Sequence, residues 1–353
     1  MKIRFASYAL DATGYGEFAR LVLTSLMTEG HELSVVLMKN PSRYQPPGAL
    51  GELGAQVEPL VGKFLSGSPD ATVINALPTS FEHYRGPGKN IGYTMFESHL
   101  VPSSWVAACN RMHGILVPAE FSREAFIRCG VKAPVFVVHP GADLPPERPK
   151  RDEEEPFTFL SAFEWSHPHK DPKSLLTAYL QEFEPGERVR LRVKTFSRGR
   201  RGDETIIHEA NQLRAAFRPN KAPEIELVIG TLDTSEMRGL YERADCYVST
   251  HHGEGWGLPI WEAMRHGVPA IATAYSSNLE FMNDSNSFLV PYKDDGRWAN
   301  IDIKDLRAAM RRAFQDRKET LRLGSIARAD MGIRFSKSEC ARSFEAAIQE
   351  ICG

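Results

Sequence analysis

The stretch THHGEGWGLPIWEAMRHGVPAIAT, residues 250–273, most constrains what this chain can fold into. Glycines recur within five positions of it, at Gly253, Gly255 and Gly257. They allow a tight turn and a close approach of the backbone to a ligand. Pro259 suits the first helical position, and Gly267 with a proline two residues later is typical of a helix end. The run 268–273 then predicts a short buried strand, so loop, helix and strand follow one another.

Two carboxylates stand eight positions apart in this stretch. Glu262 falls in the expected first turn of the helix, where the helix dipole alone explains an acid. Glu254 lies between Gly253 and Gly255, where it gains no benefit from a helix or a core. Glu254 is therefore the better candidate for contacting a ligand.

The segment EGWGLPIWE resembles the E-x7-E signature of the retaining GT-B glycosyltransferases of family 4, the group 1 type, and the similarity extends through EAMRHGVPAIAT. The resemblance implies an α/β chain of two Rossmann-like domains that face each other across a cleft. It implies a hexosyltransferase that moves a sugar from a UDP- or GDP-linked nucleotide sugar to an acceptor hydroxyl, on a glycan, a lipid-linked acceptor or a modified base. The donor is a substrate, and no further cofactor is implied.

Size and charge agree with such a protein. A chain of 353 residues is long for one domain and comfortable for two. The formal net charge of -2 predicts no general attraction to nucleic acid or to an anionic membrane. The start, MKIRFASYAL, lacks the apolar core of a signal peptide, and no window approaches the roughly 18 apolar residues of a membrane span. We expect a cytoplasmic protein without a transmembrane anchor.

Strands and helices are expected to alternate in two halves. In the first half the expected strands are 3–8, 33–38, 72–75, 90–96, 114–118 and 135–139, the helices are 15–28, 103–110 and 122–129, and 42–69 is expected to be loops with at most one short strand. In the second half the strands are 157–163, 189–196, 225–229, 246–249, 270–273 and 288–291, with closing helices at 306–314 and 338–351. The proline-rich, charged segment LPPERPKRDEEE, residues 144–155, is typical of a linker. We therefore expect an acceptor-side domain over residues 1–146, a donor domain over 147–335 and a closing helix over 336–353.

Gly14, Gly16 and Ala19 match the dinucleotide fingerprint G-x-G-x-x-A. The glycines come late, and Lys39-Asn40 stands where an acid for the ribose is expected, so a dehydrogenase ranks last among the functions considered. Glycines at a helix N-terminus still let backbone amides approach a phosphate. Gly14 and Gly16 are therefore donor-binding candidates, with a plain tight turn as the alternative.

Lys170 follows the first strand of the second half, and the resemblance implies that it binds the donor diphosphate. The arginine that the family places six positions earlier is Glu164 here, so Lys194 or Arg198 is a candidate for the missing charge. By the same resemblance Glu262 hydrogen-bonds the ribose and Glu254 the hydroxyls of the transferred sugar. Backbone amides complete the expected donor site, at Gly255, Trp256, Gly257, Leu258 and Ser276. Ser276 also suits an ordinary helix N-cap.

In the first half, NIGYTMFESHLVPSSW resembles a bacterial subgroup of these transferases. The family often has a histidine near the end of this strand that contacts the donor sugar. Glu97 and His99 both occupy that neighbourhood, and both stay candidates. His139 is at least as well explained as a structural histidine.

The chain contains no D-x-D triplet, and HPH at residues 167–169 is too isolated to indicate a metal centre, so we expect metal independence. The resemblance implies that the leaving diphosphate helps to deprotonate the acceptor. Catalysis then rests on positioning and on charge stabilisation by Lys170 and helix N-termini.

Seven basic residues lie within 188–201. The alternation RVRLRVK predicts cations on one face of a strand, a solvated sheet edge by default. The loop SRGRRG that follows could hold donor phosphates or a polyanionic acceptor, which keeps a DNA-base-modifying transferase open as a minority hypothesis. A sugar-nucleotide epimerase of GT-B shape and a non-catalytic nucleotide-sugar binding protein also stay open as functions. The oligomeric state is left open.

Overall fold

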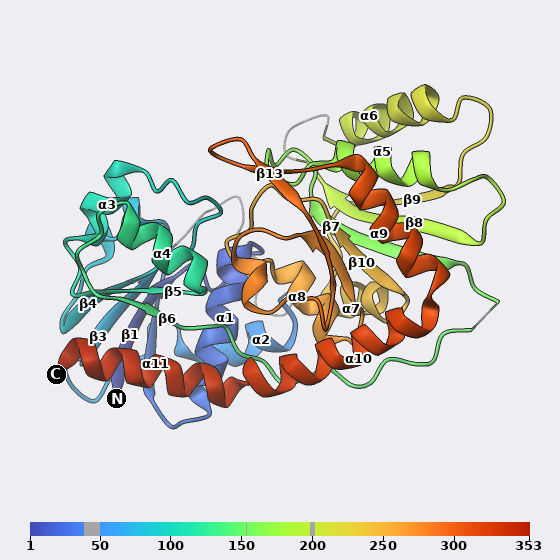
Figure 1. Cartoon of the computed structure of the whole chain (residues 1–353). Helices are drawn as coiled ribbons and strands as arrows, with labels where there is room; N and C mark the ends of the chain where they lie inside the picture. The colour runs from blue at the N-terminus through green and yellow to red at the C-terminus, as the bar shows by residue number, and fades with distance from the viewer. Residues whose placement is uncertain (39–49, 153, 198–201) are drawn as a thin grey trace. The chain divides into compact units, whose positions relative to one another are not determined.

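The computed structural model describes residues 1–38, 50–152, 154–197 and 202–353. They form two compact units. The first unit comprises Met1–Asp143 together with Gly332–Gly353, and the second comprises Leu144–Met331. Each unit is built on one six-stranded sheet with helices on both faces, which confirms the predicted α/β class (Figure 1).

The sheet of the first unit is parallel throughout and has the order β2-β1-β3-β4-β5-β6. Its strands are β1 Lys2–Ser7, β2 Glu32–Leu37, β3 Ala71–Asn75, β4 Lys89–Tyr93, β5 Gly114–Val117 and β6 Val135–Val137. Because helices cover both faces, most strand positions are buried and apolar. The chain moves outward from β1 in two directions, so the strand order reverses between β1 and β3.

Five α-helices of the described chain cover this sheet: α1 Gly14–Met27, α2 Gly51–Val57, α3 Ser103–Cys109, α4 Glu120–Arg128 and α11 Lys337–Cys352. The last helix belongs to this unit because Phe344 and Ile348 are fully buried in one core with Phe18 and Val22 of α1. On the opposite face, Phe126 of α4 belongs to a second core.

The expectation of loops over residues 42–69 is wrong for part of that segment. Residues 39–49 lie outside the described residues, but α2 and a 3-10 turn at Glu58–Leu60 follow directly. Val57 and Leu60 are buried in the core of the first unit. The short helix is hidden in the sequence because Gly51, Gly54 and Pro59 interrupt its apolar pattern.

The sheet of the second unit has the order β12-β11-β10-β7-β8-β9 and is also parallel. Its strands are β7 Phe157–Glu164, β8 Val189–Phe196, β9 Glu224–Ile229, β10 Cys246–Ser249, β11 Ala270–Thr273 and β12 Phe288–Val290. The helices are α5 Pro172–Glu182, α6 Gly202–Phe217, α7 Thr234–Glu242, α8 Leu258–Arg265, α9 Ile303–Gln315 and α10 Arg317–Arg334. A hairpin of β13 Tyr292–Asp294 and β14 Ala299–Ile301 is added to the unit.

The basic residues of β8 are not on a sheet edge, which corrects the expectation from the sequence. β9 lies outside β8 and supplies carboxylates in register with its arginines. Arg190 Nε lies 2.6 Å from Glu224 Oε1, and Arg192 Nε lies 2.8 Å from Glu226 Oε2. These cross-strand pairs neutralise much of the basic run. Residues 198–201 of the SRGRRG loop lie outside the described residues.

Helices long and apolar enough to cross a lipid bilayer do not occur among the described residues.

Candidate functional site

The second unit brings Lys170 and Glu254 into direct contact. Lys170 follows β7 and Glu254 follows β10, and these neighbouring strands are the point where the strand order reverses. Lys170 Nζ lies 2.6 Å from Glu254 Oε1. In open parallel sheets, ligands bind at the carboxyl ends of the strands on either side of such a reversal. Lys170, nominated by the resemblance, and Glu254, nominated by its glycine neighbours and by the same resemblance, therefore meet where the fold favours a ligand.

Glu254 is almost completely buried, and its surroundings keep it ionised. Burial is the largest influence and opposes the charge, but the Lys170 ammonium and the adjoining His251 and His169 together outweigh it, so the pKa of the Glu254 carboxyl is lowered from its ordinary value. His169 is also buried, and burial together with the Lys170 charge lowers the pKa of its imidazole to about 3. Burial likewise lowers the pKa of His251. At neutral pH both rings are uncharged, and Lys170 is the cation that contacts Glu254.

Thr250 joins the two loops that carry this ion pair. Its hydroxyl lies 3.1 Å from the carbonyl oxygen of Lys170 and 2.8 Å from that of Asp171. Asp171 has a φ of 44° and caps α5 by accepting a hydrogen bond from Ser174 N at 3.2 Å. The left-handed turn directly after Lys170 is thus fixed from the neighbouring strand. We therefore expect the backbone at Lys170 to be held in one conformation.

Ser276 holds Glu254 from the other side. Its φ of 75° is rare for a residue with a side chain, and residues held in such strained conformations cluster at functional sites. Its hydroxyl accepts a hydrogen bond from Glu254 N at 2.8 Å and makes no capping bond to the following 3-10 turn, Ser277–Glu280. Ser276 therefore occupies the N-cap position before this turn, as expected, but its hydroxyl does not cap the turn and instead positions the glycine loop.

Glu262 lies one turn deeper in its helix than the sequence suggested. α8 begins at Leu258, after Gly257 with a φ of 91°, and its first turn contains no acid. Glu262 Oε1 instead lies 2.6 Å from Arg265 Nη1, one turn further along the helix. The helix-dipole explanation of Glu262 is therefore replaced by an ion pair within α8.

The glycine loop is anchored by two tryptophans. Trp256 and Trp261 are buried with ring centroids 6.4 Å apart, and Trp256 also packs 5.0 Å from Phe281. The side chain of Trp256 is therefore a core element, so any donor contact at this position is made by its backbone. Gly255 is buried, and Leu258 is half-buried at the start of α8.

Of the two candidates for the missing charge beside Lys170, the structure describes Lys194 and not Arg198. Lys194 Nζ donates to the carbonyl oxygen of Gly230, and burial lowers the pKa of its ammonium. Glu164 ends β7, with Ser166 Oγ 3.3 Å from its carboxylate. Arg198, the other candidate, lies outside the described residues. The described residues thus bring one lysine, Lys170, into contact with Glu254.

In the first unit, Gly16 has a packing requirement, whereas Gly14 is exposed. A Cβ added at Gly16 would lie 2.2 Å from the carbonyl oxygen of Asp11 and 2.7 Å from that of Tyr8. Gly14 is the exposed first residue of α1, whose N-cap Thr13 accepts from Gly16 N at 3.2 Å. The tight turn therefore requires a glycine at position 16, and the donor-binding role of Gly14 and Gly16 stays a prediction.

Glu97 and His99 are both half-buried beyond the end of β4. Glu97 lies near Tyr15, whose hydroxyl is 3.2 Å from Thr94 Oγ1; burial chiefly, with the charge of Glu97 adding, raises the pKa of that tyrosine. Sequence reasoning missed Tyr15, although it lies inside the G-Y-G motif. The backbone oxygen of His99 accepts from Cys129 Sγ at 3.4 Å.

His139 has the surroundings of a structural histidine. Its Nδ1 lies 2.8 Å from the carbonyl oxygen of Pro118, and its ring centroid lies 5.2 Å from that of Phe335. Among the described residues, His, Cys, Asp and Glu side chains form no group of three that could hold a metal ion.

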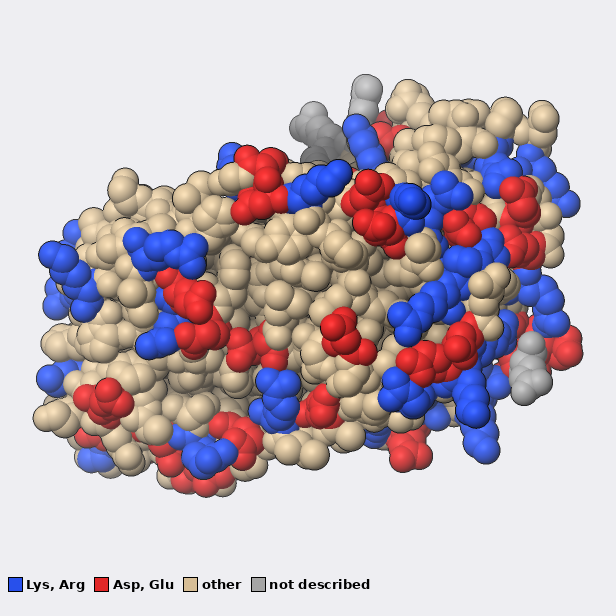
Figure 2. Space-filling view, in the orientation of Figure 1, with Lys and Arg blue, Asp and Glu red and all other residues tan. Residues whose placement is uncertain are grey.

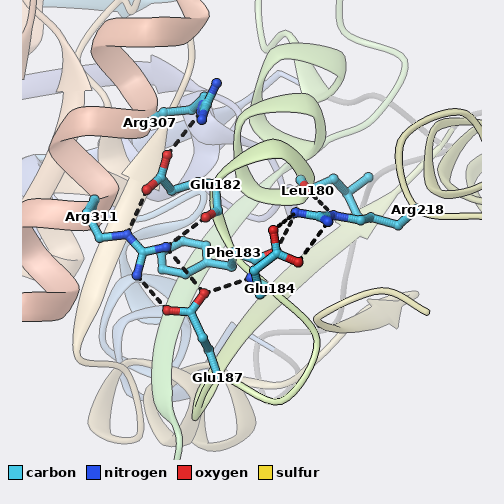
Figure 3. A network of polar contacts seen from close by, with 8 residues as sticks. All are labelled: Leu180, Glu182, Phe183, Glu184, Glu187, Arg218, Arg307 and Arg311. Atoms are coloured by element: carbon cyan, nitrogen blue, oxygen red, sulfur yellow. Dashed lines mark hydrogen bonds and ion pairs between the residues drawn. The ribbon is translucent and has the colours of Figure 1, made fainter.

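A cavity of about 690 Å³ lies elsewhere on the second unit, beside α9. It is lined by Glu182, Lys304, Arg307, Ala308, Arg311, Arg312, Gln315 and Asp316. Figure 3 shows the Arg311 guanidinium between Glu182 and Glu187, so much of this positive charge is paired locally. Figure 2 shows acidic and basic side chains interspersed over the face drawn. These features do not favour a phosphate-backbone surface.

Taken with the sheet orders, two Rossmann-type units define the class: this is the GT-B fold of glycosyltransferases. Residues 222–330, which contain α7, β10, the glycine loop and α8, match the family model described as Glycosyl transferases group 1. The expected glycosyltransferase domain is thereby confirmed over that range. Curated protein sequences include no significant match to the chain.

Three solved structures illustrate the likeness. HepE of Anabaena in complex with UDP and glucose is 16% identical, with 99% of this chain and 100% of that chain covered and a TM-score of 0.73. A sucrose-phosphate synthase from Thermosynechococcus elongatus is 16% identical, with 99% of each chain covered and a TM-score of 0.74. A glycosyltransferase from Rickettsia africae is 15% identical, with 99% and 98% covered and a TM-score of 0.70.

Proposed function

We propose that this protein is a glycosyltransferase that moves a sugar from a UDP- or GDP-linked nucleotide sugar to an acceptor hydroxyl. The observation that carries the proposal is the contact between Lys170 and Glu254, 2.6 Å apart, at the strand reversal of the unit that contains the group 1 match. A diphosphate requires a cation, and sugar hydroxyls require acceptors such as an ionised carboxylate. HepE, which has the same fold, was solved with UDP and with UDP-glucose.

In this proposal Lys170 binds the donor diphosphate, Glu254 accepts from hydroxyls of the transferred sugar and Glu262 accepts from the ribose. The amides of Gly255, Gly257 and the start of α8 steady the donor from the backbone. Thr250 and Ser276 act through the loops that they hold, because their hydroxyls bond to the backbone of Lys170 and Glu254.

We further propose transfer with retention of configuration and without a metal ion. The bond between the anomeric carbon and the β-phosphate oxygen breaks, and a bond from that carbon to the acceptor oxygen forms on the same face. The acceptor proton passes to the departing phosphate, whose charge Lys170 stabilises. A glycan, a lipid-linked molecule and a modified base all supply the required hydroxyl.

Thermal-shift measurements with UDP, GDP, ADP and their common sugar conjugates test the proposal first. A stabilisation by one nucleotide series identifies the donor, since a ligand that binds the folded state raises the melting temperature. Release of nucleoside diphosphate in the presence of candidate acceptors then tests transfer. No shift with any member of the panel would contradict the proposal.

The same assays distinguish the competing functions. An epimerase converts the donor sugar without releasing nucleoside diphosphate, and a binding protein gives a thermal shift with neither transfer nor slow donor hydrolysis. A dehydrogenase gives a shift with NAD(P). The DNA-base-modifying hypothesis rested on the basic run 188–201, whose described members Arg190 and Arg192 pair with carboxylates of β9.

A further inference from the structure

Glu254 and Lys170 contact each other, although the proposed function requires each of them to contact a different part of the donor. Lys170 Nζ and Glu254 Oε1 are 2.6 Å apart, and the exposed fractions of the two side chains are 18% and 9%. A buried carboxylate holds its cationic partner strongly because water does not screen the pair. A phosphate that approaches Lys170 therefore also approaches the negative charge of Glu254.

Among the described residues of the second unit, few cationic groups can relieve that repulsion. The imidazoles of His169 and His251 are neutral at physiological pH because burial lowers their pKa values. The Lys194 ammonium is bound to the carbonyl oxygen of Gly230, and Arg265 is paired with Glu262. The Glu254 backbone is fixed by the Ser276 hydroxyl at 2.8 Å, so the carboxylate cannot leave the site with its loop unless that bond breaks.

We infer that Glu254 is the specificity-determining residue that makes the site favour the intact sugar nucleotide over the free nucleoside diphosphate. This rests on the proposed function. Both ligands bring negative phosphates to Lys170, and both therefore meet the like charge of Glu254. The sugar nucleotide also brings hydroxyl donors, which satisfy the carboxylate in place of the lysine. The nucleoside diphosphate lacks them and leaves Glu254 buried beside a phosphate.

The inference gives Glu254 a part in product release. Once the sugar has left for the acceptor, the carboxylate loses its hydroxyl partners and competes again for Lys170. The product phosphate is then bound less tightly than the donor phosphate was, so turnover is not limited by retained nucleotide. The carboxylate thus opposes phosphate binding unless a sugar is attached.

The test is the affinity of Glu254→Gln for ligands with and without the sugar, measured by calorimetry. Glutamine removes the charge and keeps an oxygen that accepts from Lys170. We expect the nucleoside diphosphate, UDP or GDP, to bind about 5- to 20-fold tighter than it binds the wild type, because a carboxylate no longer competes with the phosphates for Lys170. The matching sugar nucleotide should change less, and product inhibition should become stronger.

Two control variants test whether the tighter binding of the nucleoside diphosphate comes from the loss of the contact between Glu254 and Lys170. In Lys170→Met/Glu254→Gln the gain should disappear relative to Lys170→Met, because the competition for the lysine no longer exists. Glu242→Gln removes a carboxylate from the Arg238–Glu242 pair on α7, which has the same 2.6 Å contact but is more exposed. It should leave both affinities unchanged.

A folded Glu254→Gln variant with unchanged or weaker nucleoside diphosphate binding would overturn the inference, and so would a gain that persists without Lys170. If the Glu254→Gln variant does not fold, the wild-type protein provides the test. It must bind the sugar nucleotide more tightly than the corresponding nucleoside diphosphate, and equal or reversed affinities overturn the inference. A wild type that binds no nucleotide of the panel refutes the proposed function itself.

Discussion

Gly14 and Gly16 share a motif but differ in what surrounds them. Gly16→Ala should destabilise the protein by about 1 to 3 kcal/mol, because its Cβ would overlap the carbonyl oxygens of Asp11 and Tyr8. Gly14→Ala should leave the free energy of unfolding nearly unchanged or raise it, since Gly14 is an exposed first residue of a helix. Urea unfolding of the two variants measures the difference. Equal stabilities would contradict the packing role of Gly16.

Lys170→Ala and Glu262→Ala should each weaken donor binding while the protein stays folded. Lys170 supplies the charge for the diphosphate, and Glu262 supplies an acceptor for the ribose. We expect about a tenfold loss for Lys170→Ala, the size of one charge-assisted hydrogen bond. Calorimetry with the identified donor tests both variants, and Arg265→Ala is the matched control for the Glu262 ion pair. Unchanged affinity in both variants would remove these residues from the site.

For single residues, the sequence indicated which side chains are candidates for a site but not which contacts fix their positions. An acid flanked by glycines can be recognised from the sequence as a site candidate, because neither a helix nor a core explains it there. The Glu262–Arg265 pair was readable in principle, since residues three apart share a helix face. The strained Ser276 and the bridge from Thr250 to Lys170 and Asp171 depend on two loops distant in sequence, and no local pattern signals them.

Among the elements, α9 is tied to the end of α5 by two arginines, Arg307 and Arg311, which share the Glu182 carboxylate (Figure 3). Arg311 contacts Glu182 at 2.7 Å and Glu187 at 2.5 Å, and its guanidinium lies over the Phe183 ring. Arg311→Ala should lower the free energy of unfolding by about 2 kcal/mol, because Glu187 loses its guanidinium partner and Glu182 keeps only Arg307.

Arg218→Ala is the comparison for that prediction. Arg218 pairs with Glu184, whose side chain is 65% exposed and returns to water when its partner is removed. Its other hydrogen bonds go to the carbonyl oxygens of Leu180 and Phe183. We expect a loss below about 1 kcal/mol. Chemical unfolding of both variants tests the contrast, and an Arg311→Ala loss no larger than that of Arg218→Ala would refute it.

Prediction of elements succeeded where apolar runs are continuous and failed where tertiary context decides. The strands of both sheets were predicted because helices cover both faces and keep the runs apolar. α10 was missed because charged residues interrupt its sequence, RKETLRLGSIARADMGIR, and its buried positions are few. β8 was expected at an edge because its basic alternation looks solvated, whereas its neutralising carboxylates come from β9.

For the whole molecule, buried histidines make stability depend on pH. Burial first, then nearby cations, lowers the pKa of His169 to about 3 and that of His266 to about 4. In the unfolded chain the pKa of an imidazole is about 6.5, so below that pH the unfolded chain binds protons that the folded chain does not. Stability should therefore be full above that pH and fall as the pH drops towards 4, by up to about 1.4 kcal/mol per pH unit for each histidine.

Urea unfolding at several pH values measures this slope. His266→Phe is the informative variant, because the ring stacks on Tyr241 and its buried Nδ1 has no hydrogen-bond partner among the described residues. The variant should show a shallower slope between pH 6 and 4 than the wild type. A wild-type stability that is flat or rises on acidification would contradict the assignment of neutral buried histidines.

The first unit is assembled from segments at both ends of the sequence, and this has a consequence for synthesis. α11 supplies Phe344 and Ile348 to the core around α1, yet it leaves the ribosome after every residue of the second unit. The roughly 200 residues between β6 and the end of α11 take about 10 to 40 s to translate. During that interval the second unit can fold, while the core around α1 lacks the side chains of α11. The first unit, although its synthesis begins first, is therefore the unit whose core is completed last.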